Sequence, residues 1–209
     1  MPARNIVKKY GAGEYYHVYN RGVAKMDIFR EDEDYVYMLH LLKRHLSEEP
    51  SFDKNGREIK NYSSEIDLIA FCLMPNHYHF VVYLKEADGL ERLMRSVMTS
   101  YSMYFNKKYA RVGTLFQNHF LASRITDESY FWHISRYVHL NPVEITGGQY
   151  ADYPFSSYEY FMGNKSAEWV HPEYFVETEA DRVQYRRFMD DYVERRDLLK
   201  AIEHQMAHT

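Results

Sequence analysis

Apolar and polar residues alternate with two distinct periods along the first half of the chain. Residues 15–20 (YYHVYN) alternate and are β-prone, and an Arg-Gly pair follows them, so we expect a strand. Residues 31–46 place apolar side chains at helical spacing behind an acidic first turn, which predicts a helix. Residues 66–73 and 77–84 predict two more strands, joined by a Met-Pro-Asn turn. The polar residues 50–63 predict a loop or a hairpin tip.

Helical patterns dominate the second half of the chain. Apolar spacing predicts helices over residues 89–109 and 127–141, and Pro142 would end the second of them. Residues 114–125, between these helices, are expected to be extended, and residues 156–163 predict a short helix. The order β-α-β-β-α-β-α predicts an α+β fold in which helices pack on a mostly antiparallel sheet.

Length and composition narrow the class of protein. The 209 residues suit one medium domain, or one domain with an appendage. A single cysteine excludes a disulfide framework, and no apolar run approaches the roughly 18 residues of a membrane helix. The first residues lack the apolar core of a signal peptide. We therefore expect a cytoplasmic protein without membrane contact. The tail, residues 173–209, contains no glycine or proline and is expected to form one long helix or two shorter ones.

The net charge of −4 conceals an uneven distribution of charge. Residues 91–125 carry six basic side chains against one acid, whereas acids collect in residues 31–34 and in the tail. A basic segment within an acidic protein is typical of a surface that contacts a nucleic-acid backbone. It also fits an ordinary solvated helix face, and both interpretations remain open at this point.

His77 and His79 are the most informative pair of side chains. They lie two residues apart at the start of a predicted strand, so they project from one face while Tyr78 and Phe80 project from the other. Two imidazoles placed in this way can chelate a divalent ion if another element supplies a third ligand. The alternative is a pair of hydrogen-bonded histidines at a strand end. Their position directly after a Pro-Asn turn, where an active-site edge would lie, favours the metal.

Tyr137 and Asn141 could complete such a site from a predicted helix. They are four residues apart and therefore stack on one helix face. Asn141 would supply a neutral oxygen as the third ligand, and Tyr137 would lie beside the ion. A phenol, with a pKa of about 10, is a poor nucleophile at neutral pH unless a base assists it. A bound metal can nevertheless orient a phosphate group of a substrate for attack by the phenol. Because the chain holds 21 tyrosines, Tyr137 also fits a packing role. His133 and His139 are interpreted as ordinary helix residues.

Five motifs, in order, resemble those of the single-tyrosine HUH transposases, where HUH denotes His-hydrophobe-His, and of the REP-associated tyrosine transposases in particular. They are YHVYNRG at residues 16–22, IFRED at 28–32, MPNHYH at 74–79, YFNKKY at 104–109 with GTLFQ at 113–117, and RYVHLNPV at 136–143. The resemblance covers about residues 14–160. The chain departs from the family at His119 and near Leu121, where basic residues are common, which affects the expected DNA contacts rather than the chemistry.

The resemblance implies a ferredoxin-like or RRM-like α+β core. We assign residues 1–165 to a single-strand DNA nuclease domain and residues 166–209 to a helical C-terminal extension. Shorter relatives act as dimers with shared sites and some longer ones as monomers, so a homodimer is a possible assembly.

The resemblance also implies roles for individual residues. Tyr137 would be the catalytic nucleophile, and His77, His79 and Asn141 would bind a divalent metal, Mg or Mn. Enzymes of this kind cut single-stranded DNA next to a hairpin and leave a 5′-phosphotyrosine and a free 3′-OH. The expected partner is therefore single-stranded DNA that carries a hairpin, either REP-like or from the end of a mobile element.

Basic side chains on and around the predicted helix 89–109 are the expected DNA contacts. Cations hold phosphates, and aromatic rings stack on bases with roughly 1–3 kcal/mol per base. Tyr101 and Tyr104 are assigned mainly to packing. The predicted DNA-binding residues are Arg21, Arg92, Arg95, Lys107, Lys108, Arg111 and Arg124.

Three functions are compatible with these residues. The first is a DNA-nicking transposase, in which Tyr137 attacks a scissile phosphate. The second is a domesticated protein that binds DNA hairpins but does not cut, and the intact set of catalytic residues argues against it. The third is a replication-initiation or relaxase enzyme of the same superfamily. Such enzymes commonly carry a third histidine or a second tyrosine, and Tyr137 has no such companion in its motif.

Overall fold

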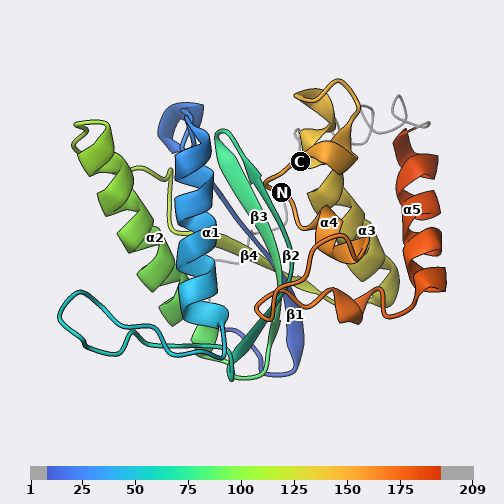
Figure 1. Ribbon diagram of the computed structural model, residues 1–209, viewed down its shortest axis with the longest axis horizontal. Helices are drawn as coiled ribbons and strands as arrows, with labels where there is room; N and C mark the ends of the chain where they lie inside the picture. Colours follow the sequence, from blue (N-terminus) through green and yellow to red (C-terminus); the bar gives the residue numbers. More distant parts are fainter. Residues whose placement is uncertain (1–8, 194–209) are drawn as a thin grey trace.

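A computed structural model, which describes residues 9–193, shows a sheet between two layers of helices (Figure 1). Helices α1 (Asp32–Leu46) and α2 (Gly89–Lys108) cover one face of the sheet. Helices α3 (Glu128–Leu140), α4 (Tyr158–Phe161) and α5 (Glu179–Val193) lie on the other side. The predicted α+β class is confirmed.

The sheet has four strands within the described residues, and all of its pairings are antiparallel. The strands are β1 (Glu14–Arg21), β2 (Ile66–Met74), β3 (His77–Leu84) and β4 (Leu121–Ile125). Their order across the sheet is β2-β3-β1-β4, so β1 lies beside β3, and the side chains of His17 and His79 come into contact although they are 62 positions apart in the sequence. The predicted chain order of strands and helices is confirmed.

The prediction that residues 114–125 are extended is wrong for the first half of that range. Only Leu121–Ile125 forms a strand. The backbone before it binds the end of β1 instead: the Val23 amide donates to the Leu115 carbonyl, and the Gln117 amide donates to the Arg21 carbonyl. These loop contacts depend on the tertiary position of β1, which the local pattern does not encode.

Strand alternation divides the apolar side chains between two cores. Val18, Tyr78 and Phe80 pack against α1 and α2, whereas Val81 and Ile125 pack on the side of α3. Nearly all of these side chains are fully withdrawn from water. Because each strand has one residue in two on each face, the two cores together specify which polar side chains lie beneath α3.

The C-terminal segment, residues 166–193, packs into both cores. Trp169 stacks on Phe71, with ring centroids 5.9 Å apart, and Tyr185 is fully buried, where its hydroxyl donates to Ser135 of α3. The expected tail helix is present as α5, and the remainder of that prediction, residues 194–209, lies outside the described residues. Within the described part of the chain, every helix is too short or too polar to span a lipid bilayer. The domain boundary at residue 165 stays a prediction.

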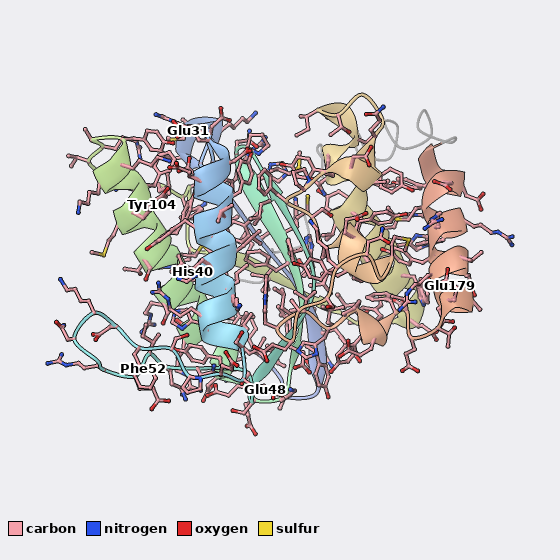
Figure 2. The ribbon with its side chains drawn as sticks, viewed as in Figure 1. Glu31, His40, Glu48, Phe52, Tyr104 and Glu179 are labelled. Atoms are coloured by element: carbon pink, nitrogen blue, oxygen red, sulfur yellow. The ribbon has the colours of Figure 1, made fainter. Side chains whose placement is uncertain are left out.

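A buried carboxylate joins the start of α1 to the end of α2. Asp34 is fully buried and accepts hydrogen bonds from the Arg30 amide, the Tyr109 hydroxyl and the Lys108 ammonium at 2.7–2.9 Å. Tyr104, which Figure 2 shows on α2 beside α1, donates a further hydroxyl at 3.1 Å. Burial alone would raise the pKa of Asp34, but these donors outweigh it and hold the pKa below its ordinary value.

Replacement of Asp34 by alanine should destabilise the fold. The change leaves the backbone amides of Arg30 and Glu31 and the half-buried Tyr109 hydroxyl without their acceptor, so we expect the free energy of unfolding to fall by about 3 kcal/mol in urea denaturation. The matched control is Glu33→Ala, because the Glu33 carboxylate also pairs with Lys108 but is 79% exposed. The control should lose no more than about 0.5 kcal/mol. Equal losses would contradict the role of Asp34.

The pH dependence of stability should include a contribution from His45. Burial lowers the pKa of His45 more than its hydrogen bond to the Lys60 carbonyl raises it. The contribution of His45 to stability is therefore fully present above its pKa in the unfolded chain, which is about 6.5. This contribution is lost as the pH falls toward the lower pKa of His45 in the folded protein, by at most about 1.4 kcal/mol per pH unit. His45→Asn keeps a donor for Lys60 but does not titrate. In urea denaturation at about pH 7.5 and about pH 5.5, the wild type should lose more stability than this variant; identical slopes would exclude the effect.

Candidate functional site

The sheet face beneath α3 carries a row of histidine and tyrosine side chains. His17 and Tyr19 on β1 project from this face, as do His77 and His79 on β3. Tyr19 is the register partner of His79, so the two strands place their aromatic side chains next to each other. The rings of His77 and His79 are 5.0 Å apart. As strand alternation predicts, Tyr78 is instead buried in the opposite core.

Helix α3 places Tyr137 and Asn141 over this row. The Tyr137 ring stands edge-on to the rings of His79 and His17, with centroids 5.2 and 6.0 Å away. Asn141, at the C-terminal cap of α3, brings its Oδ1 to 3.2 Å from Nε2 of His77. Its amide donates to the Tyr137 carbonyl at 2.8 Å. The structure thus brings together all four residues to which the sequence assigned chemistry, and Tyr137 remains 39% exposed.

Hydrogen bonds determine which nitrogen of His77 is available. Nδ1 of His77 lies 2.6 Å from Oδ1 of Asn76, and the Asn76 amide nitrogen donates to the Lys25 carbonyl. Asn76 Oδ1 is therefore the acceptor, and the proton of His77 lies on Nδ1. The lone pair of Nε2 then faces the carboxamide oxygen of Asn141 at 3.2 Å. Two acceptors that face each other in this way match a cation between them.

His79 has a ring nitrogen, Nε2, that makes no hydrogen bond. Its side chain is almost completely buried, its Nδ1 lies 2.9 Å from Nε2 of His17, and its Nε2 is buried without a hydrogen-bond partner. A buried polar atom without a partner is costly unless a ligand or ion satisfies it. Burial also lowers the pKa of His77, His79 and His17, the last to about 3. The three imidazoles are consequently neutral at pH 7 and keep lone pairs.

The donor set fits a divalent cation. His77 and His79 offer two Nε2 atoms, and Asn141 offers a carboxamide oxygen. Imidazole nitrogen together with neutral oxygen suits Mn and is workable for Mg. Within residues 9–193, no three His, Cys, Asp or Glu side chains form a group that could hold a metal. A third protein ligand for an ion held by His77 and His79 would have to be of another type, and the carboxamide oxygen of Asn141 is such a donor.

Of the predicted basic residues, Arg21 lies at this site. It is exposed, it is the register partner of His77, and its positive charge contributes to the lowered pKa of His77. Arg92 lies elsewhere. It pairs with Glu65, next to the end of the sheet where β3 finishes at Leu84. At about 3.3 Å per residue, that end is roughly 23 Å along the strand from His77.

The other predicted cations also lie away from the His77–His79 row. Arg95 pairs with Glu91 on α2, and Arg124 pairs with Glu14. Lys108 is held by Asp34. Lys107 lies at the end of α2, which covers the opposite face of the sheet from α3, and Arg111 follows α2 and donates to Asn106 of that helix. The structure therefore does not gather the basic segment, residues 91–125, around the site.

The sequence pattern alone indicates no function for His17, Tyr19 or Asn76. A signal for His17 and Tyr19 existed, because they alternate in β1 as His77 and His79 do in β3. Alternation could not show that β1 and β3 are neighbours. The sequence predicts Asn76 as a turn residue, and the structure shows that its side chain also accepts a hydrogen bond from His77.

The two further histidines of α3 have structural partners. His139 is fully buried and contacts the hydroxyls of Tyr185 and Ser157 at 2.8 and 2.7 Å. His133 contacts the guanidinium of Arg136 at 2.8 Å. These contacts agree with the interpretation of both histidines as ordinary helix residues.

Comparison with known proteins identifies the family. Residues 34–141, just over half of the chain, match the family model described as "Transposase IS200 like". No curated protein matches the sequence significantly. The fold is similar to a solved structure of a REP-associated tyrosine transposase bound to a REP hairpin, with a TM-score of 0.54, 17% sequence identity, and coverage of 77% of this chain and 87% of that chain. The family match spans His77, His79 and Tyr137 and ends at Asn141, and the protein therefore belongs to the IS200-like transposase family.

Proposed function

We propose that this transposase-family protein cuts and rejoins single-stranded DNA next to a hairpin, with Tyr137 as the nucleophile. Family membership supports a role in transposition, and the structural relative with a bound REP hairpin makes hairpin DNA the proposed partner. The observation that carries the proposal is the convergence of Tyr137 and Asn141 from α3 with His77 and His79 from β3. One chain supplies all four groups, so a homodimer is not needed to assemble the site.

The proposed reaction is a phosphoryl transfer that conserves the energy of the phosphodiester. The phenol oxygen of Tyr137 attacks the scissile phosphorus and releases its proton, the bond to the 3′ oxygen breaks, and that oxygen leaves as a 3′-OH. The 5′ phosphate stays on Tyr137. Attack by a 3′-OH on this phosphotyrosine reverses the step and rejoins a strand. When bound, a divalent ion (Mg or Mn) supplies Lewis-acid polarisation of the phosphate.

The chain's own residues hold and orient the reacting groups. His77, His79 and Asn141 would bind the ion through the lone pairs described above. The rings of His79 and His17 pack against the Tyr137 ring and restrict its orientation. We assign a phosphate contact to Arg21, because it is exposed beside His77. These groups lie on a strand pair and a helix, which position reacting atoms more rigidly than loops do.

The other predicted basic residues remain predicted DNA contacts, but four of them already pair with carboxylates of the protein. Arg92, Arg95, Lys108 and Arg124 would have to exchange a carboxylate partner for a phosphate. A hairpin that extends beyond the cleavage site could reach some of them, because phosphate contacts position a nucleic acid over a large surface. They are therefore proposed to act on DNA affinity and not on the chemical step.

Tyr137→Phe should abolish a covalent protein–DNA adduct. The wild type, incubated with a hairpin-tailed single-stranded oligonucleotide and Mn²⁺, should give an adduct on a denaturing gel. Because the 5′ phosphate stays on the enzyme, the adduct should carry a label placed at the 3′ end of the oligonucleotide and no label placed at its 5′ end. The matched control is Tyr130→Phe, since Tyr130 lies on the same helix and is similarly exposed.

Two outcomes of the adduct experiment would contradict the proposal. An adduct that survives Tyr137→Phe excludes Tyr137 as the nucleophile. Tight hairpin binding without any adduct, in Mg²⁺ or Mn²⁺, supports the alternative of a domesticated hairpin-binding protein that does not cut.

Replacement of either histidine should separate cleavage from binding. His77→Ala and His79→Ala remove one donor each, so we expect cleavage to fall below detection while hairpin affinity, measured by gel shift in EDTA, changes by less than about threefold. His133→Ala is the control, because His133 lies on the exposed side of α3. A variant that loses hairpin binding and cleavage together would indicate a structural role for the histidine pair.

A further inference from the structure

His17 occupies a position that the proposed reaction does not use directly. Its Nε2 lies 2.9 Å from Nδ1 of His79, and both side chains are more than nine-tenths buried. The two imidazoles are nearly parallel, with an angle of 20° between their planes and centroids 5.0 Å apart. Tyr19 stacks on the His17 ring at 4.9 Å, and Tyr137 meets it edge-on. His17 is therefore clamped between its neighbours and aimed at His79.

We propose that His17 is a positioning residue that fixes the tautomer and orientation of His79, so that Nε2 of His79 keeps its lone pair for a divalent cation. This inference rests on the proposed function of His79 as a metal ligand.

The contact between the two histidines permits only two proton arrangements. Each neutral imidazole has one N–H and one lone pair, so one ring must donate and the other accept. If His17 donated, the proton of His79 would lie on Nε2, and that N–H would be buried with no acceptor. If His79 donates through Nδ1, its Nε2 carries a lone pair instead. The second arrangement leaves no buried N–H of His79 without an acceptor and offers a cation the atom it needs.

His77 shows the same arrangement independently. Its Nδ1 donates to Oδ1 of Asn76 at 2.6 Å, and its Nε2 faces Asn141. Both proposed ligands are thus held through Nδ1 and are open at Nε2. Histidines that bind metals almost always donate their other N–H to such a partner, and loss of the partner typically weakens metal affinity 10–100-fold.

His17 is not itself placed as a third histidine ligand. Among the described residues, His17, His77 and His79 do not form a group that could hold a metal. Its Nε2 is engaged by His79, and the neutral oxygen of Asn141 occupies the third position. The role left for His17 is that of a hydrogen-bond acceptor.

The tautomer of His79 can be tested without metal. Long-range ¹H–¹⁵N NMR spectra of metal-free protein should show the proton of His79 on Nδ1. His17→Leu removes the acceptor and should move His79 toward the Nε2–H form. His17→Gln can place a carboxamide oxygen near the position of Nε2, so it should preserve the Nδ1–H form.

Metal affinity provides the second readout. In titrations followed by the EPR signal of free Mn²⁺, His17→Leu should lose about 10–100-fold in affinity, and His17→Gln should stay within about threefold of the wild type. Ser123→Ala is the matched control, because Ser123 is the register partner of His17 on β4 and should leave Mn²⁺ affinity unchanged. Thermal unfolding and amide NMR spectra establish that each variant is folded.

The outcomes separate this inference from the proposed function. An Nε2–H proton on His79 in the wild type, or unchanged Mn²⁺ affinity in folded His17→Leu, overturns the role of His17. A wild type that binds no Mn²⁺ but shows the expected tautomers contradicts the metal site while supporting control of the His79 tautomer by His17. Parallel loss of the Nδ1–H tautomer and of affinity in His17→Leu, with rescue in His17→Gln, supports both.

Discussion

The antiparallel register between β1 and β3 is the constraint on which the site depends. Side chains alternate strictly along a strand, so a slip of one residue would turn His79 into the α1–α2 core and expose Tyr78 and Phe80 beneath α3. Burial of those two large aromatic side chains makes such a slip costly. The same register places Arg21 opposite His77. Apolar packing on one face of the sheet thus fixes the positions of the polar side chains on the other face.

Helix α3 depends on a second set of contacts. Ile134 and Val138 bury its apolar stripe in the core shared with α5, which leaves Tyr137 and Asn141 facing the histidine row. Tyr185 of α5 bonds to Ser135 on the same helix. The C-terminal segment therefore supports the helix that carries the proposed nucleophile.

Electrostatics at the site are unusual for a protein that is proposed to handle DNA. His17 and His79 are buried, His77 is half-buried, and all three are neutral at pH 7. Among the described residues, Arg21 is the predicted DNA-binding cation that lies beside them. Lys108 and Arg92 neutralise the protein's own carboxylates instead. A local charge of +5 along residues 91–125 is a sum over both ends of α2 and a strand on another layer. Such a sum does not describe one surface.

Local periodicity in the sequence is sufficient to predict strands β1, β2 and β3, the main helices, the shared face of His77 and His79, and the one-turn spacing of Tyr137 and Asn141. Those features follow from backbone geometry within a few residues. Only the tertiary structure decided that His17 adjoins His79, that residues 115–117 bind the end of β1, and that Arg92 lies far from the site. The physical reason is that strand order and ion pairing join residues tens of positions apart. The energy of such contacts depends on how the layers of the fold pack together, so the spacing of residues within one element cannot predict them.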